Sequence, residues 1–218
     1  MMLSQELIAV YIMIAELTAW LMGSRLFSLL RTGPMLHPVE LLAVACVLWK
    51  FRFEYKCVLP YKSTPIAFLA FSLAYQIWLS PSTPTIGASI SSGFLVPLYE
   101  EVLYRVILIH VVEKRLRQTL SFRSRTIVSV LLSSLLFTFA HRLTVESLPD
   151  LLICLISGLA LSSVYLASAK NILEPLLIHV LHNLHALLAN GFETSFTTPI
   201  IFYSVVFLWS WVRLGSEQ

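Results

Sequence analysis

The amino-acid sequence predicts an all-α fold: a polytopic membrane protein with about eight transmembrane helices, in which residues 1–218 form a single membrane domain. Hydrophobic residues make up 57% of the chain and charged residues only 12%. Soluble globular domains are about 25% charged, so this chain has too few charged side chains to cover a water-facing surface. Apolar runs close to the roughly 20 residues that cross a bilayer recur along the whole chain and leave no room for a separate soluble domain.

Short segments that contain helix-breaking residues separate the apolar runs. Eight helices are therefore expected, over residues 5–24, 38–50, 64–80, 90–112, 126–142, 150–168, 172–190 and 197–213. The first is expected to be an uncleaved helix and not a signal peptide, because no basic segment precedes it. The second is short for a full span, and without it the N-terminus would lie on the opposite side of the membrane.

Basic residues predict the orientation, because the cytoplasmic loops of membrane proteins are enriched in lysine and arginine. With eight helices, one side of the membrane would hold eleven basic residues: Lys50, Arg52, Lys56, Lys62, Lys114, Arg115, Arg117, Arg123, Arg125, Lys170 and Arg213. The other side would hold only Arg25, Arg31 and Arg142. Both termini are therefore expected in the cytoplasm. The net charge of +3 does not indicate nucleic-acid binding, since the basic residues fall where loops meet lipid head groups.

The three cysteines give no sign of a covalent or metal framework. Cys46, Cys57 and Cys154 are odd in number and show no C-x-x-C spacing. Two of them lie inside apolar runs. Free, buried cysteines are expected, with no disulfide framework and no zinc knuckle.

The fourth expected helix contains three charged residues within six positions, Glu100, Glu101 and Arg105. One charged residue at the bilayer centre costs about 2.5–3.5 kcal/mol on insertion scales, so such a cluster indicates a function. Glu101 and Arg105 lie at i and i+4 and are expected to pair on one helix face. Glu100 is rotated away from that pair and is available as a general base. The alternative is a purely structural ion-pair cluster that joins helices.

Two other helices carry imidazole and amide groups. The fifth ends at His141, and a lone histidine near a helix end is more often hydrogen-bonded than catalytic. In the seventh, His179 and Asn183 lie one turn apart on the same face. Two such donors on a rigid helix can stabilise an oxyanion. His182 and His185 continue the run and are expected to make hydrogen bonds between helices.

These motifs, in this order, resemble the CAAX protease and bacteriocin-processing family of intramembrane endopeptidases, also called the Abi family. The resemblance covers residues 90–188, the expected catalytic core. It rests on Glu-Glu-x-x-x-Arg at Glu100, Glu101 and Arg105, on Phe-x-x-x-His at Phe137 and His141, and on His-x-x-x-Asn at His179 and Asn183. Gly158 and Tyr165 also resemble the family's intervening helix. One departure is Val106, since the family usually has glycine after the motif arginine, where it allows close helix approach.

The resemblance implies a membrane peptidase that cleaves a peptide or protein substrate near its membrane-associated end. Glu100 would activate a water molecule, and His141 would help to hold and polarise it. His179 and Asn183 would stabilise the tetrahedral oxyanion. Three further residues would support this site: Glu101, Arg105 and Phe137.

Zinc is the alternative to metal-free activation of water. Glu100, His141 and His179 are residue types that bind catalytic zinc, and the family is often described as metalloproteases. Their spacing lacks the compact His-Glu-x-x-His arrangement, in which one helix supplies two ligands and the base. Glu100 would also have to serve as both ligand and base. We therefore favour no metal cofactor, with zinc bound by these three residues as the alternative.

Two other classes of function stay open. One is a non-catalytic membrane protein of the same fold, acting in bacteriocin immunity or as a scaffold, although the four catalytic residues are all retained. The other is an ion-coupled transporter, because intramembrane Glu, His and Arg also mark ion paths. Inverted repeats would favour transport, and none is found. The expected location is multi-pass in the plasma (inner) membrane, or in the endoplasmic reticulum membrane if the chain is eukaryotic.

Overall fold

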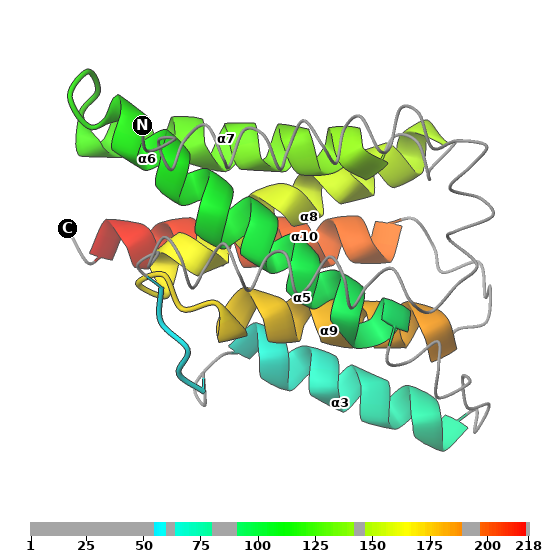
Figure 1. Cartoon of the computed structure of the whole chain (residues 1–218). Coiled ribbons are helices and arrows are strands. Elements are labelled where there is room, and N and C mark those ends of the chain that lie inside the picture. Colours follow the sequence, from blue (N-terminus) through cyan, green and yellow to red (C-terminus); the bar gives the residue numbers. More distant parts are fainter. Residues whose placement is uncertain (1–54, 60–63, 80–90, 142–146, 189–196, 217–218) are drawn as a thin grey trace.

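The computed structural model describes residues 55–59, 64–79, 91–141, 147–188 and 197–216 (Figure 1). These residues are mostly helical and contain no strand, as the sequence predicts. The separate helices are α3 (Thr64–Leu79), α7 (Phe122–His141), α8 (Leu148–Ala167), α9 (Leu173–Leu188) and α10 (Thr197–Ser216). The first two predicted helices, near 5–24 and 38–50, lie outside the described residues.

A further helical stretch, residues 91–116, changes its hydrogen-bond pattern three times without interruption. Its successive parts are the π-helical η1 (Ser91–Leu95), the helix α5 (Val96–Glu101), the π-helical η2 (Val102–Leu108) and the helix α6 (Ile109–Leu116). The sequence predicts that this helix ends at 112. It continues to Leu116 because Glu, Lys and Arg after the apolar run are good helix formers.

Helices α7, α9 and α10 run nearly parallel in this view, while α8 and the 91–116 stretch cross them obliquely (Figure 1). Helix α8 packs most extensively against α7 and α10, while α3 lies along α9. The connections at 117–121 and 168–172 lie at the same end of the bundle as the end of α10 (Figure 1). Lys170 and the basic residues on either side of the α6–α7 connection therefore lie at this end among the described residues. The orientation relative to a membrane stays a prediction.

Local sequence explains where α8 begins and ends. Ser147 is extended, and its hydroxyl accepts a hydrogen bond from the Asp150 amide at 3.2 Å, which caps the first turn. At the other end, Ala169 and Lys170 adopt positive φ values of 53° and 63° and stop the helix. The chain then reverses into α9.

Asn171, in this reversal, holds a segment that lies far away in the sequence. Its side-chain amide donates to the Val58 carbonyl at 2.7 Å, and its side-chain oxygen accepts from the Val58 amide at 3.0 Å. Lys56 pairs with the same turn through two backbone hydrogen bonds. Residues 55–59 are thereby fixed to the connection between α8 and α9.

Three helices of the described part are long and apolar enough to cross a membrane: α7, α8 and residues Thr198–Gly215 of α10. Helix α10 also presents an apolar stripe outward, with Ile201, Val205, Leu208 and Val212 between 59% and 75% exposed. Their spacing of three or four residues places them on one face. Such a face is suited to lipid and not to water, and it supports a membrane protein.

One hydrophobic core forms where the 91–116 stretch meets α7 and α8. Val106 is buried there beside Phe137 and Tyr165. Gly158 allows the close approach of α7 and α8, because a Cβ at this position would lie 3.1 Å from Ser134 Cα.

The cysteine prediction is partly wrong. Cys57 and Cys154 are free, but Cys57 is exposed, since it lies in the 55–59 segment at the surface; Cys46 lies outside the described residues.

Candidate active site

Glu100 and Glu101 are the last residues of α5, and Arg105 lies in the π-helical part that follows. Every residue of η2 is buried, so its wider turn is enclosed by neighbouring helices. Single π-helical turns of this kind are rare and are frequent at functional sites. The apolar pattern of the sequence does not predict this turn.

The predicted pair of Glu101 and Arg105 is confirmed. The Arg105 Nε donates to Glu101 Oε2 at 3.1 Å, and both side chains are fully buried. The guanidinium also lies 5.0 Å from the centroid of the Phe137 ring. Because a buried carboxylate or guanidinium is costly without a partner, each charge permits the burial of the other.

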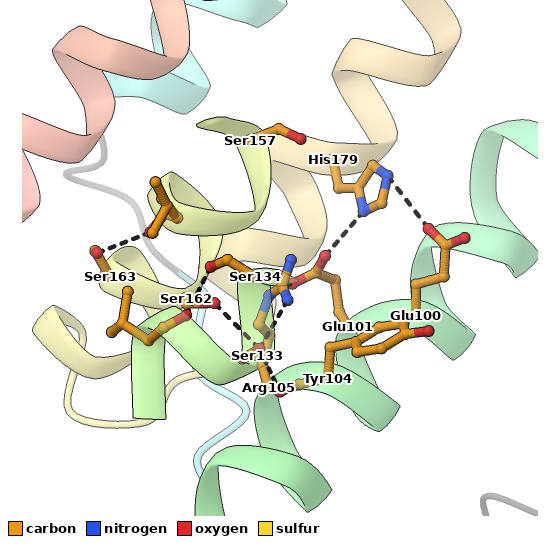
Figure 2. Close-up of polar contacts among 12 residues, drawn as sticks. Glu100, Glu101, Tyr104, Arg105, Ser133, Ser134, Ser157, Ser162, Ser163 and His179 are labelled. Carbon is orange, nitrogen blue, oxygen red and sulfur yellow. Dashed lines mark hydrogen bonds and ion pairs between the residues drawn. The ribbon is translucent and has the colours of Figure 1, made fainter. Parts of the chain in front are cut away.

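Glu100 faces two histidines from two other helices (Figure 2 shows the one in α9). Its Oε1 lies 3.6 Å from Nε2 of His141, the last residue of α7. Its Oε2 lies 3.6 Å from Nε2 of His179 in α9. The side chain of Glu100 is 14% exposed, that of His141 24% and that of His179 8%. The three groups that the sequence places on separate helices therefore meet at one point, which is partly open at its surface.

The other ring nitrogen of each histidine is already engaged. Nδ1 of His141 donates to the Phe137 carbonyl at 2.9 Å, and Nδ1 of His179 donates to Glu101 Oε1 at 2.9 Å. These donors are assigned from their partners, since a carbonyl and a carboxylate only accept. In the neutral rings, both Nε2 lone pairs therefore point toward the Glu100 carboxylate. A carboxylate oxygen and a ring nitrogen that both accept hydrogen bonds can be bridged only by a donor. A water molecule has two O–H groups and can donate to both.

Phe137 packs beneath this group of polar side chains. Its ring centroid lies 4.4 Å from that of His141 and 6.1 Å from that of His179. It also meets the Tyr104 ring edge-on at 5.4 Å. Phe137 is only 2% exposed. Its ring contacts restrict the positions of both imidazoles and exclude water from the buried side of the site.

The remaining candidates all lie on α9. Asn183 follows His179 by one helical turn and is partly buried. The His182 ring meets the Tyr203 ring of α10 edge-on, with centroids 5.2 Å apart. His182 therefore faces α10, in line with an interhelical role. A hydrogen-bonding role for His185 stays a prediction.

Two contacts of this region were not predicted from the sequence. The first is the bond from His179 to Glu101. The four-residue spacing in the sequence predicts only the pairing of Glu101 with Arg105. The second is the bond from Arg105 to Ser133 of α7. One sequence signal could have indicated the second contact. Ser129 and Ser133 lie four residues apart, on the same face of an otherwise apolar helix.

A zinc ion was tested against this geometry. The Nε2 atoms of His141 and His179 and the carboxylate of Glu100 have suitable donor chemistry. However, in the part of the chain that the structure describes, no group of three or more His, Cys, Asp or Glu side chains converges closely enough to hold a metal ion. No metal-dependent step is therefore assigned to these side chains.

A comparison with protein families identifies residues 81–185 as matching the family described as "Type II CAAX prenyl endopeptidase Rce1-like". This range contains Glu100, Glu101, Arg105, His141 and His179. No curated protein and no solved structure matched the chain. The matched family is one of proteases and is consistent with the resemblance noted in the sequence. Residues 81–185 are thus similar to the Rce1-like type II CAAX prenyl endopeptidases, which is consistent with the CAAX protease and bacteriocin-processing family.

Proposed function

We propose that this chain is an intramembrane endopeptidase that hydrolyses a peptide bond with a water molecule activated by Glu100. The observation that carries the proposal is the approach of the Glu100 carboxylate to Nε2 of both His141 and His179, at 3.6 Å each. Direct hydrogen bonds between nitrogen and oxygen are shorter, about 2.7–3.2 Å. A polar contact at the longer distance is suited to bridging by water.

In the proposed first step, Glu100 accepts a proton from the water while the water oxygen attacks the carbonyl carbon of the substrate. Nε2 of His141 accepts the second hydrogen bond of that water and orients it. The carbonyl π bond opens to an oxyanion. The carbon–nitrogen bond then breaks, and the proton held by Glu100 passes to the leaving amine. A general base of this kind contributes about 10²- to 10⁴-fold to the rate.

His179 and Asn183 are proposed to bind the oxyanion. Since the Nδ1 hydrogen of His179 is bonded to Glu101, His179 donates to substrate only when Nε2 also carries a proton. Glu101 accepts the bond from Nδ1 and so holds Nε2 of His179 toward the substrate. Donors fixed before the reaction stabilise a developing oxyanion without reorganisation, which makes this usually the largest contribution to catalysis.

The family description supports a substrate class: proteins whose C-terminal CAAX segment carries a prenyl group. Such a substrate would be held at the bilayer by its lipid. The lipid-facing stripe of α10 supports placement of the site within the membrane. A site that is enclosed by helices supports cleavage near the membrane-associated end of the substrate.

Cleavage by purified protein in detergent or proteoliposomes tests the proposal. A fluorogenic peptide ending in a prenylated CAAX segment should be cleaved by the wild-type chain, and Glu100→Gln should abolish cleavage. Glu113→Gln is the matched control, because Glu113 lies on α6 of the same stretch and pairs with Lys170 at 2.9 Å, away from the site. A folded wild-type protein that cleaves neither prenylated nor unmodified peptides would exclude the function and favour a non-catalytic role.

A further inference from the structure

Ser133 of α7 makes an unusual number of hydrogen bonds for a serine in an apolar helix. It is fully buried. Its hydroxyl donates to the Tyr104 carbonyl at 2.8 Å, accepts from Arg105 Nη1 at 3.1 Å and accepts from the Ser162 hydroxyl of α8 at 3.2 Å. One donor and two acceptor positions are all that a serine hydroxyl possesses. A serine in a membrane helix otherwise commonly bonds its own helix, four residues back.

We propose that Ser133 is a positioning residue for the active site, which acts on His179 through Arg105 and Glu101, and that Ser162 holds Ser133 in place. The proposal rests on the proposed function. The contacts form an unbroken series (Figure 2): Ser133 to Arg105 at 3.1 Å, Arg105 to Glu101 at 3.1 Å, and Glu101 to His179 at 2.9 Å. The series joins α8, α7, the 91–116 stretch and α9.

The bonds of Arg105 explain why Ser133 matters. A guanidinium has five N–H donors in a rigid plane. Within the described residues, Nη2 of Arg105 has no hydrogen-bond partner. The bond from Nε to Glu101 and the bond from Nη1 to Ser133 therefore set the plane of the group, with the Phe137 ring against it. Without the serine hydroxyl, the guanidinium can rotate about its bond to Glu101.

Ser133 also fixes the backbone that carries Arg105. Its bond to the Tyr104 carbonyl attaches α7 to the residue directly before Arg105, inside the π-helical part. The same hydroxyl thus restrains both the side chain and the main chain at this position. Glu101 lies one turn earlier, and its carboxylate orients the imidazole of His179.

Ser134→Ala provides a matched control for Ser133→Ala. Ser134 is the next residue of α7 and is equally buried, but its hydroxyl donates only within its own helix, to the Val130 carbonyl at 2.7 Å. Ser133→Ala should lower kcat about 10- to 100-fold with little change in KM, because a small misplacement of a catalytic group is costly. Ser134→Ala should leave kcat within about twofold, and Ser133→Thr, which keeps the hydroxyl, should retain more activity than Ser133→Ala.

Equal kcat values for Ser133→Ala and Ser134→Ala, with Glu100→Gln inactive, would overturn the positioning role and leave the proposed function intact. A second measurement decides the case of a wild-type protein that shows no cleavage. In protein labelled with ¹⁵N-histidine, the Nδ1 resonance of His179, assigned by its absence in His179→Gln, should shift in Ser133→Ala and not in Ser134→Ala. An unchanged resonance would refute the proposal. If Ser133→Ala does not fold, Ser162→Ala is compared in the same way, with a smaller expected shift.

Discussion

Glu100 and Glu101 are adjacent in the chain, yet their carboxylates lie in two different environments. Glu101 is fully buried, with one oxygen bonded to Arg105 and the other to His179. Glu100 is partly exposed and approaches its two histidines only at 3.6 Å. Successive residues of a helix are rotated by about 100°, which is enough to send the two side chains in different directions. Glu101, whose oxygens are both bonded, stabilises the structure of the site, while Glu100, with only long contacts, is available to react.

The change expected to matter most is the loss of the Glu100 carboxylate, which should affect the rate of cleavage. Glu100→Gln removes the proposed base and should lower kcat by about 10²- to 10⁴-fold. Its thermal unfolding should match that of the wild type, because the contacts of Glu100 are long and partly solvated. Cleavage assays and thermal unfolding of the same preparation measure both properties. An unstable, active Glu100→Gln variant would reverse the assigned roles.

Glu101→Gln tests whether the Glu101 carboxylate stabilises the folded protein. It leaves the fully buried Arg105 without its charged partner, and breaking a buried pair costs about 3–5 kcal/mol in soluble proteins. We expect a clearly lower Tm and a poor yield of folded protein. The isosteric control is Glu100→Gln, which makes the same chemical change one residue away. Equal Tm values for the two variants would show that the two carboxylates contribute equally to the stability of the folded protein.

Gly158→Ala probes the packing beneath both carboxylates. The added Cβ would lie 3.1 Å from Ser134 Cα and 3.3 Å from Phe137 Cδ1, tighter than ordinary contact. Overpacking of a filled core costs about 1–3 kcal/mol. Gly215→Ala is the control, because a Cβ there meets nothing within 4 Å. Displacement of Phe137 would also lower activity, so activity and Tm should fall together for Gly158→Ala alone.

The smallest expected effect concerns metal. Since the proposed mechanism uses no metal ion, prolonged chelation should leave cleavage unchanged within about twofold, a change worth less than 1 kcal/mol in the barrier. Elemental analysis of the purified protein should find no stoichiometric zinc. Loss of activity on chelation, restored by zinc and not by magnesium, would make Glu100, His141 and His179 ligands.

The sequence predicted the part of this site that depends on local geometry. The pairing of Glu101 with Arg105 follows from their spacing of four residues, and the six later helices follow from the apolar runs. The π-helical turn could not be predicted, because hydropathy does not encode a change of hydrogen-bond register. Ser133 could not be distinguished from Ser134 either. Both are serines in one apolar helix, and only the packing of α7 against the 91–116 stretch directs one hydroxyl to Arg105.

The clasp between Asn171 and Val58 has a consequence for the assembly of the molecule. Its two partners are separated by 113 positions in the chain. During synthesis, which proceeds from the N-terminus, Val58 therefore emerges long before the side chain that holds it exists. Helix α3 can form earlier, but residues 55–59 reach their final place only after α8 has formed and the chain has turned back. The end of the bundle that carries most of the described basic residues is thus completed only after Asn171 has been synthesised.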